Sequence, residues 1–485
     1  MTTLRPYQNT SVAAILAYLQ RGESPLYALP TGGGKTVVAG SVLQTVAAPD
    51  HGWRVLWLAH RRELIRQASK ALRVAGIDHG IIAPDHRFDG TDRVAIASVD
   101  TLPRRVDALA PWLDGVRLVV ADECHHAVSP KWQRAMAACP SAQRLGLTAT
   151  PYRLDGQGLG HIFSAAVRGP SIRALIDDGY LVEPNVYMPR TDLDLGGLKR
   201  RFGDWKTGDL VNRVDRPDIT RVALRWYSAR LAGTPTVVFC ASIEHATHVA
   251  EAFGAAGWRA AVVHGGTPEA ERDAIFANLA TGRLQIVCNV EIITEGVDVP
   301  RIGGVILLRP TQSTALYLQM IGRALRLLEG KAFTPIIDIA RCSAIHGLPD
   351  EDRPWRLDTG LANGRLQQLV EATRVCPKCA RVHRRVDPAC PGCGYRVPQV
   401  PKPVATATRD GDRPSGFPGL TVQQVRDMPY GRLLTLGTDK AALIRIASIR
   451  GYKLGWVSRI LDERRRTSAP VQRATGARRW RRATG

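Results

Sequence analysis

The sequence lacks any apolar run of about 18 residues, the length that a helix needs to cross a bilayer. Its first residues, MTTLRPYQNT, do not have the pattern of a secretory signal peptide. Both absences predict a soluble, intracellular protein. The nine cysteines are odd in number and mostly scattered, which argues against a disulfide framework. With 45% apolar residues the composition is globular, and at roughly 150 residues per domain the 485 residues predict about three domains.

Acidic residues are scarce relative to basic ones, and the imbalance is concentrated at one end of the chain. The 66 Lys and Arg against 44 Asp and Glu give a formal net charge of +22. Residues 1–372 contribute +5 of this charge and residues 373–485 contribute +17. A strong positive excess favours a polyanionic partner, nucleic acid before anionic membrane. We therefore expect a nearly balanced motor or catalytic core with a basic, nucleic-acid-binding C-terminal quarter.

Two stretches of the chain alternate short β-branched runs with segments of helical length. This alternation predicts an α/β fold with two tandem parallel sheets, each covered by helices on both faces. Clear strand signals lie at 55–60, 94–99, 118–122, 236–241 and 334–340. The expected parts are a first α/β domain (1–185), a connecting segment (186–230), a second α/β domain (231–345), a linker (346–372), a Cys-rich segment (373–396), a Pro-rich linker (397–419), a helical module (420–466) and a basic tail (467–485).

A glycine-rich segment, LPTGGGKT (29–36), stands directly before a helix-compatible run. In this context backbone N–H groups and a helix N-terminus bind phosphates, with Lys35 on the β- and γ-phosphates and Thr36 on Mg²⁺. The consensus phosphate loop begins with glycine, whereas this one has Leu29. The expected phosphate-binding residues are Thr31, Gly32, Gly33, Gly34, Lys35 and Thr36.

The segment LVVADECHH predicts a buried strand that ends in two acids, Asp122 and Glu123. Asp122 would hold Mg²⁺ through water, and Glu123 would orient and deprotonate the attacking water. Adjacent Cys124, His125 and His126 are not expected to bind a metal, because successive side chains on a strand point in opposite directions.

The segments GGGKT, DECH and LTATP (147–151), in this order, resemble the first RecA-like domain of a superfamily 2 helicase. LRPYQ (4–8) resembles that family's adenine-reading motif, which implies nucleotide contacts for Arg5 and Gln8. The resemblance also implies that Thr148 and Thr150 link the ATP state to strand binding, and that residues around Arg61, Thr101, His264 and Thr294 touch nucleic acid. It extends over about residues 1–345, within the DECH-box group that includes RadD-like and XPB-like DNA helicases and the motor subunits of restriction enzymes.

The second α/β stretch carries segments that resemble motifs IV, V and VI of the same family: FCASIEHA, TEGVDVP and QMIGRALR. The resemblance implies nucleotide contacts for Gly296 and Asp298. On a helix, motif VI residues at i, i+4 and i+7 share one face; these are Gln319, Arg323 and Arg326. Facing the phosphate loop, the two arginines would act as fingers, which can contribute roughly 10³ to 10⁵ in rate. A solvated basic helix face is the alternative.

Four cysteines form two close pairs with the spacing C-x2-C-x10-C-x2-C: Cys376, Cys379, Cys390 and Cys393. Four thiolates in two knuckles suit a structural, tetrahedral Zn²⁺. A redox pair is less favoured, because neither pair begins a βαβ helix. Further on, residues 438–466 predict two helices joined at Gly451, with Thr438 as the N-cap of the first. In the tail, ARRWRR sets Trp480 between arginine pairs, where a base could stack.

Together these residues and the resemblance predict an ATP-dependent DNA helicase or translocase with ATP, Mg²⁺ and structural Zn²⁺ as cofactors. The resemblance implies a cytoplasmic protein of a prokaryote or phage that acts in DNA repair, recombination or replication. DNA is favoured over RNA as the partner, because RNA helicases of this superfamily usually read DEAD rather than DECH; no membrane partner is expected, and protein partners would use the C-terminal module. An RNA helicase, or an ATP-switched remodeller that does not unwind, remains the alternative. No nuclease motif is recognisable.

Overall fold

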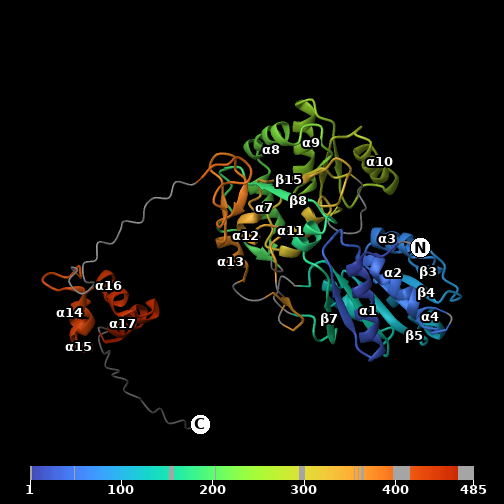
Figure 1. The fold of residues 1–485 in the computed structure, drawn as a ribbon, viewed down its shortest axis with the longest axis horizontal. Coiled ribbons are helices and arrows are strands. Elements are labelled where there is room, and N and C mark those ends of the chain that lie inside the picture. Colours follow the sequence, from blue (N-terminus) through green and yellow to red (C-terminus); the bar gives the residue numbers. More distant parts are fainter. Residues whose placement is uncertain are drawn as a thin grey trace, which may run out of the picture. The chain divides into compact units, whose positions relative to one another are not determined.

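The computed structural model describes most of the chain in two compact parts. The described residues are 3–48, 50–151, 158–201, 204–293, 301–353, 355–358, 360–361, 365–396 and 415–467. The first unit comprises residues 1–396 and the second residues 397–485 (Figure 1). Within the described residues, no helix combines the length and the apolar character that crossing a bilayer requires.

The first domain of the first unit is built on a seven-stranded sheet with the order β3-β4-β2-β5-β6-β1-β7, and every pairing in it is parallel. Its strands are β1 (Pro25–Ala28), β2 (Arg54–Ala59), β3 (His79–Ile82), β4 (Val94–Ser98), β5 (Val116–Asp122), β6 (Gln143–Thr148) and β7 (Ala165–Arg168). Its helices are α1 (Pro6–Gln20), α2 (Lys35–Val46), α3 (Arg62–Val74), α4 (Val106–Leu113), α5 (Pro130–Met136) and α6 (Ile172–Asp177). Two apolar clusters form on the two faces of the sheet, so the central strands are buried on both sides, as the sequence predicted.

The second domain of the same unit carries a six-stranded parallel sheet with the order β12-β13-β11-β14-β15-β8. Its strands are β8 (Glu183–Tyr187), β11 (Thr236–Phe239), β12 (Ala260–Val263), β13 (Ile286–Asn289), β14 (Gly304–Leu307) and β15 (Phe333–Asp338). Helices α8 (Pro217–Arg230) and α9 (Ile243–Ala255) pack on one face. Helices α10 (Glu269–Ala280) and α11 (Thr314–Gly322) pack on the other. The predicted fold class of two tandem α/β domains is therefore confirmed.

The boundary between the two domains differs from the expected one. Strand β8 pairs with β15, with Glu183 opposite Phe333, so the second sheet takes its edge strand from the segment assigned above to the first domain. The expected connecting segment, 186–230, holds a short hairpin of β9 (Arg200–Arg201) and β10 (Asp204–Trp205), then α7 (Thr207–Val214) and α8. Pro184 interrupts the β-branched pattern by which the other strands were recognised.

The expected linker at 346–372 is folded against both domains where it is described. It contains β16 (Trp355–Arg356), β17 (Gly360–Leu361) and α13 (Arg365–Glu371), and it follows α12 (Ser343–His346). We call Trp355–Asp358 the return segment, because it leads back to the first domain. There the backbone N–H groups of Leu159 and Gly160 both donate to the Leu357 carbonyl, at 2.7 and 3.0 Å. The Arg168 guanidinium lies 4.8 Å from the centroid of the Trp355 ring.

The Cys-rich segment, residues 373–396, is part of the first unit, and we call it the four-cysteine module. Its hairpin of β18 (Thr373–Val375) and β19 (Val382–Arg384) lies beside β8, the edge strand of the second sheet. The Met188 N–H donates to the Ala380 carbonyl at 2.8 Å, and the Arg381 guanidinium donates to Asn185 Oδ1 at 2.5 Å. The module therefore covers a sheet edge that would otherwise be open.

The described part of the second unit is a small helical domain with its own apolar core. Its helices are α14 (Val422–Asp427), α15 (Tyr430–Leu436), α16 (Lys440–Arg450) and α17 (Leu454–Thr467). Gly451 ends α16 in the left-handed conformation (φ 71°), as expected, but the predicted Thr438 cap is wrong. The N-cap is Asp439, which accepts a 2.7 Å hydrogen bond from the Ala442 N–H, because its carboxylate stands directly before the first turn. Residues 397–414 and the ARRWRR segment lie outside the described residues.

Candidate active site

The glycine-rich loop connects β1 to α2, as the motif predicted. Gly32 and Gly34 both have left-handed backbones, with φ of 90° and 92°. A Cβ at Gly34 would lie 2.6 Å from the Gln8 amide nitrogen, so both conformation and space require glycine there. Helix α2 begins at Lys35, so its first N–H groups and its positive dipole end point at the space beyond the loop.

The two acids of the DECH segment lie at the carboxyl end of β5, facing this loop. Asp122 and Glu123 are both buried, and Lys35 Nζ lies 3.6 Å from Glu123 Oε1. Glu123 adopts a left-handed backbone (φ 52°), and its N–H donates to Asp122 Oδ1 at 3.1 Å. Such a conformation is unusual for a residue with a side chain, and here it turns the carboxylate toward the lysine. Burial raises the pKa of the Cys124 thiol well above its ordinary value, with further effects of Glu123 and Asp122, so this residue is a packed neutral thiol.

The second domain contributes two arginines to the same space, although not in the predicted way. Gln319, Arg323 and Arg326 do not share one helix face, because α11 ends at Gly322. Gly322 packs against Thr31 of the loop. The chain then turns, and the backbone of Arg326 forms an isolated antiparallel β-bridge with Leu181. Arg323 and Arg326 both line a cavity next to the phosphate loop, whereas Gln319 is buried within the second domain and does not line it.

A cavity of about 420 Å³ brings these groups together between the two domains. Its charged and polar lining comes from the loop and α2 (Thr31, Gly32, Gly34, Lys35, Thr36), from β5 (Asp122, Glu123) and from the second domain (Arg323, Arg326). Sequence reasoning missed the wall formed by α3, which includes Gln67 and Lys70. Their i, i+3 spacing places them on one helix face, but only the packing of α3 beside α2 shows that this face looks into the cavity.

Three of the predicted nucleotide-contacting residues do not line this cavity: Arg5, Gln8 and Gly33. The Gln8 amide nitrogen donates to the Gly33 carbonyl at 3.1 Å, and Gln8 Oε1 accepts from the Arg5 N–H at 2.9 Å. The Arg5 guanidinium lies 4.4 Å from the centroid of the Tyr180 ring. Gln8 therefore fixes the shape of the phosphate loop in this structure, and neither residue faces the cavity. Gly296 and Asp298 lie outside the described residues.

A chain of contacts leads from Glu123 to the TAT segment. His125 Nδ1 lies 3.5 Å from Glu123 Oε2 and 3.3 Å from Thr148 Oγ1. Thr148 in turn donates to the Thr150 carbonyl at 3.0 Å and accepts from the Thr150 N–H at 3.1 Å. This arrangement connects Glu123 to the segment that was expected to link ATP state to strand binding.

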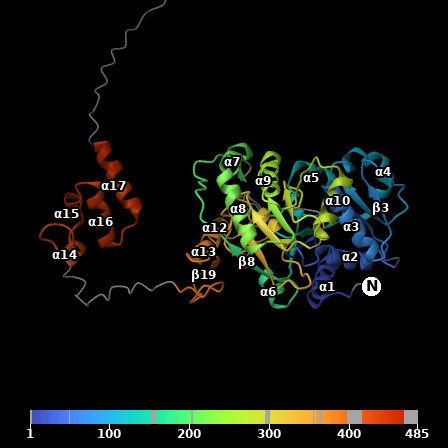
Figure 2. The same ribbon diagram turned by 90° about the horizontal axis from the view of Figure 1, so that it is seen from above.

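Of the expected nucleic-acid contacts, Arg61 lies at the interface of the two domains, where its guanidinium donates to the Glu291 carbonyl at 2.9 Å. Helix α3, which follows it, forms ion pairs with α10 of the second domain (Figure 2): Arg66 with Glu269, and Glu63 with Arg272 at 2.5 Å. Thr101 is buried, and Nδ1 of the His264 ring accepts a hydrogen bond from the Gly266 N–H of the same turn at 3.1 Å. Thr294 lies outside the described residues.

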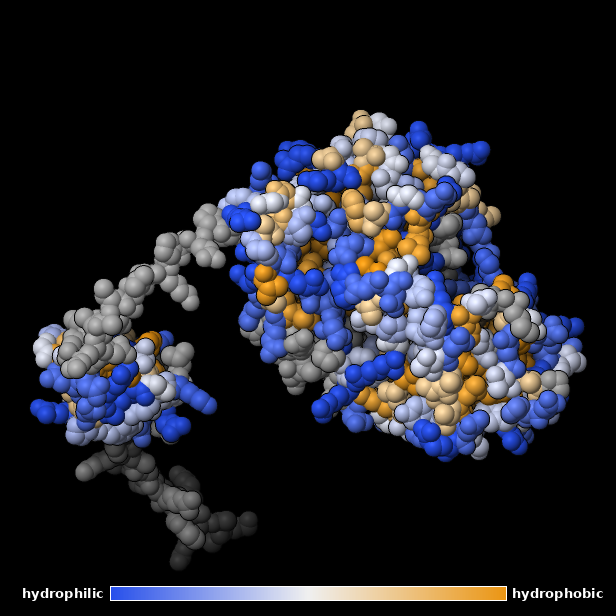
Figure 3. All heavy atoms as spheres, viewed as in Figure 1, coloured by the Kyte–Doolittle hydropathy of each residue, from blue (hydrophilic) through white to orange (hydrophobic). Residues whose placement is uncertain are grey.

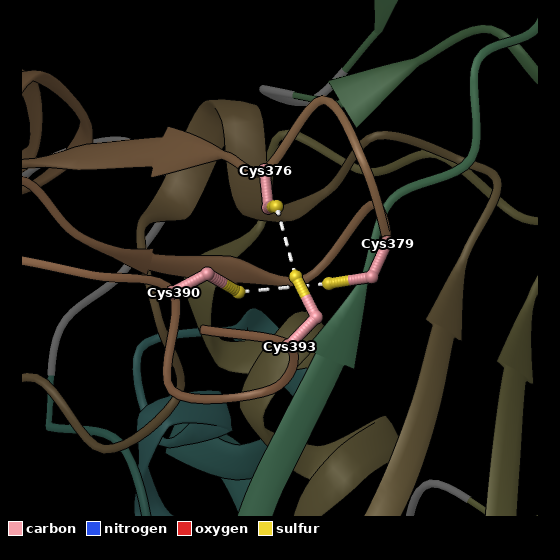
Figure 4. A group of neighbouring side chains, drawn as sticks. All are labelled: Cys376, Cys379, Cys390 and Cys393. Atoms are coloured by element: carbon pink, nitrogen blue, oxygen red, sulfur yellow. Dashed lines mark hydrogen bonds between the residues drawn. The ribbon is translucent and has the colours of Figure 1, made fainter. Parts of the chain in front are cut away.

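The cysteines of the four-cysteine module point their sulfur atoms at one common point (Figure 4). All four sulfurs lie within 4.8 Å of one another; Cys376 and Cys393 are separated by 3.6 Å, and Cys379 and Cys390 by 3.5 Å. A tetrahedral ion with Zn–S bonds of about 2.3 Å requires sulfurs somewhat under 4 Å apart, so the donor set fits zinc. Among the described residues, this is the one His, Cys, Asp and Glu cluster of this kind.

Comparison with known proteins agrees with this geometry. A family model described as type III restriction enzyme, res subunit, matches residues 1–153, and one described as helicase conserved C-terminal domain matches residues 220–327. A 51.5 kDa protein of a Lactococcus phage is 29% identical over 368 residues, which is 76% of each chain. The putative ATP-dependent helicase IRC3 of Saccharomyces cerevisiae is 29% identical over 360 residues, 70% of this chain and 52% of the yeast protein.

The solved fragment of a putative HsdR subunit of a type I restriction enzyme from Vibrio vulnificus has a similar fold. Its TM-score is 0.57 at 22% identity, over 74% of this chain and 70% of the fragment. The chain spans about half the length of the yeast relative. Together, the family models and the helicase relative support a superfamily 2 helicase with ATPase and helicase activity, which implies ATP and Mg²⁺ as cofactors and nucleic acid as partner.

Proposed function

We propose that this chain is an ATP-driven DNA helicase or translocase of the RadD-like and XPB-like group. The observation that carries the proposal is the shared cavity, which Lys35 and Glu123 enter from one domain and Arg323 and Arg326 from the other. A nucleotide held there touches both domains at once, so its binding and hydrolysis change how firmly the domains are held together.

The residues of the first domain would perform the hydrolytic step. Lys35 and the first N–H groups of α2 would bind the β- and γ-phosphates, and Thr36 and Asp122 would hold the magnesium ion. When bound, this ion neutralises charge on the phosphates. Glu123 would accept a proton from the water that attacks the γ-phosphorus, while the bond to the β-phosphate oxygen breaks and ADP leaves. Lys35, 3.6 Å away, would orient that carboxylate before the substrate arrives.

The arginines of the second domain would complete the site only when the domains are closed. Their guanidinium groups would stabilise the charge that develops on the transferred phosphoryl group. The contacts from Glu123 through His125 to Thr148 supply a route by which this state reaches the surface that binds the strand. Gln319, buried and away from the cavity, would position α11.

DNA as the partner is supported by the names of the matched family model and the similar solved structure, both of restriction enzymes. The DECH sequence and the basic C-terminal quarter favour the same partner. We also propose that the protein acts in DNA repair, recombination or replication and that it is cytoplasmic. The location is supported by the nine cysteines, all described and none in a disulfide, as in a reducing compartment.

The test is the ATPase rate of the full chain with single-stranded DNA, duplex DNA, forked DNA and single-stranded RNA at one stated salt concentration. We expect DNA to stimulate turnover and RNA to do so much less. Stimulation by RNA alone would overturn the DNA assignment. A strand-displacement assay then separates unwinding from translocation, since DNA-stimulated turnover without displacement identifies a translocase or remodeller.

We also propose that the four-cysteine module holds one structural Zn²⁺. The four sulfurs leave no open position for a substrate, so the ion would stabilise the two knuckles rather than take part in catalysis. We expect one zinc per chain by atomic absorption and the loss of most of it in Cys379→Ser. A metal-free wild-type protein with the same melting temperature before and after chelator treatment would contradict this assignment.

A further inference from the structure

A larger cavity, about 1370 Å³, lies in the second domain between α8 and the four-cysteine module. We call it the α8 groove. Its walls are one face of α8, the loop that follows β8 (Met188–Asp192), the first cysteine knuckle (Cys376–Cys379) and Arg341, which comes just after β15. The α8 groove and the nucleotide cavity have no lining residue in common.

The sequence of α8 explains why this face is polar at its rim. Ile219, Ala223 and Tyr227 point into the core of the second domain. Residues four positions apart on the other side, Arg221 and Arg225, then project toward the groove. The helix therefore joins the sheet with one face and offers two neighbouring guanidinium groups on the other.

The groove is strongly cationic. Six basic residues line it, all exposed: Arg190, Arg221, Arg225, Arg230, Arg341 and Lys378. Two acids line it as well, and one of these, Asp218, is already paired with Arg216 through hydrogen bonds of 3.0 and 2.8 Å. Within the described part of the chain, Arg221 and Arg225 form neither an ion pair nor a side-chain hydrogen bond. Unpaired cations that converge on one groove indicate an anionic ligand.

The floor of the groove is fixed in place. The Tyr187 and Trp226 rings lie 5.9 Å apart between centroids, and the Arg230 guanidinium lies 4.9 Å from the Tyr187 ring. The wall from the four-cysteine module is held to the sheet by the Met188 to Ala380 hydrogen bond. The cations are therefore carried by packed elements, which reduces the entropy lost when a ligand binds.

We propose that the α8 groove binds the sugar-phosphate backbone of a nucleic-acid strand. Guanidinium groups donate bidentate hydrogen bonds to phosphates, and each contact releases condensed counterions. The ligand class rests on the proposed function, but the binding itself needs no ATP. All walls of the groove belong to the second domain and the module docked on it, so opening and closing of the nucleotide cavity leaves this contact unchanged. The α8 groove would thus hold the strand throughout the ATP cycle, whereas contacts that span both domains would change with the bound nucleotide.

The test compares two double variants of the full chain, Arg221→Ala/Arg225→Ala and a matched control, Arg117→Ala/Arg283→Ala. Arg117 and Arg283 are also exposed and unpaired among the described residues, but they lie near the amino ends of β5 and β13, away from the α8 groove. Binding of a labelled single-stranded oligonucleotide is followed by fluorescence anisotropy at several salt concentrations.

We expect the α8 double variant to bind about tenfold more weakly and to lower the slope of log K against log salt by about two, since each lost phosphate contact removes roughly one. The control should keep both the affinity and the slope of the wild type. Basal ATP turnover should be unchanged in both variants. An α8 variant with the wild-type slope would overturn the proposal.

A second measurement locates the ligand. Acetylation of Lys378, read by peptide mass mapping, should slow when the oligonucleotide is present and should slow equally in a Lys35→Ala background. The Lys35→Ala background tests the α8 groove separately from the nucleotide cavity. If the proposed ATPase function is wrong, the oligonucleotide should still protect Lys378. If poly-glutamate protects Lys378 as well as the oligonucleotide does, the groove binds acidic protein segments and the nucleic-acid assignment is wrong.

Discussion

The nucleotide cavity and the α8 groove are both lined by arginines, yet the arginines stand in different surroundings. In the cavity, Arg323 is 7% exposed and faces the opposite wall, where Lys35 and Glu123 are paired. In the groove, Arg221 and Arg225 are exposed and unpaired within the described residues. A desolvated charge acts strongly on one substrate in one geometry, whereas an exposed charge is screened by salt and binds any backbone of opposite sign.

The second unit adds a third use of arginine. Arg464 donates to the Gly437 carbonyl at 2.7 Å and to the Leu434 carbonyl, and Arg445 donates to the Gly416 carbonyl at 2.6 Å. Arg464 thus ties α17 to the end of α15, and Arg445 ties α16 to the loop that precedes α14. The net charge of a segment therefore does not locate its binding surface, because part of that charge is engaged in the fold.

The largest effect should come from the first wall of the cavity. We expect Lys35→Ala and Glu123→Gln each to reduce ATP turnover below detection, because one loses the phosphate contact and the other the proton acceptor. Phosphate release is the measurement. Binding of the oligonucleotide without ATP serves as the control, and it should stay within twofold of the wild type. Undiminished turnover in either variant would refute the assignment of the cavity.

Removal of one finger should have the next largest effect. We expect Arg323→Ala to lower turnover by about 10³, the lower end of the effect of an arginine finger. Its matched control is Arg309→Ala, an arginine of the same domain that pairs with Glu291 at 3.0 Å and does not line the cavity. Similar turnover in the two variants would show that the second domain does not complete the site.

Acid should weaken the domain that carries both the fingers and the groove. Burial lowers the pKa of His245 to about 4 and that of His346 to about 4, below their ordinary value of 6.5. The unfolded chain then binds more protons than the folded chain between those values, so stability falls as pH decreases through that window. By pH 5 we expect a loss of roughly 2 kcal/mol per histidine relative to pH 7.

Urea unfolding at pH 7 and pH 5, followed by fluorescence, measures this loss. The double variant His245→Asn/His346→Gln removes both groups, and it should be less sensitive to acid than the wild type. The same difference between the two pH values in both proteins would contradict the role of these histidines.

The smallest effect concerns the second unit. We expect Arg464→Ala to lower the local stability of α15 and α17 by about 1–3 kcal/mol, because it leaves partly buried carbonyls without their donor. Hydrogen exchange in these helices is the measurement, with Lys440→Ala as the exposed control. Oligonucleotide affinity should change by less than twofold. A large loss of oligonucleotide affinity without faster hydrogen exchange would show instead that Arg464 contacts nucleic acid, as proposed for the arginines of the α8 groove.

The sequence predicts the features that depend on local order. The phosphate loop, the acids at the end of β5, the strands β2, β4, β5, β11 and β15 and the close set of four cysteines all follow from short segments, since residue type and spacing determine their geometry. On the visible face of the first unit, apolar residues gather in several groups among polar ones (Figure 3). Apolar atoms normally make up a large share of a globular protein's surface.

Features that depend on contacts between distant segments could not be predicted in this way. Strand β8 belongs to the second sheet because it pairs with β15. Glu183 lies opposite Phe333, which comes 150 residues later in the chain. Helix α11 ends at Gly322, where Thr31 from the phosphate loop of the other domain packs against it. The amide of Gln8 is engaged by a carbonyl that only the folded loop presents. None of these partners is close in sequence.

The two domains are joined by two stretches of chain rather than one. The first runs from β7 to β8, and the second is the return segment, held to Leu159 and Gly160. Figure 1 shows β7 on one side of the domain pair and α3 with α10 on the other. Because both attachments lie on one side, they favour a hinge motion, in which one domain rotates relative to the other about a single axis, over sliding or twisting of the domains. The greatest travel is then expected at α3 and α10, and a pair of dyes there would report each swing.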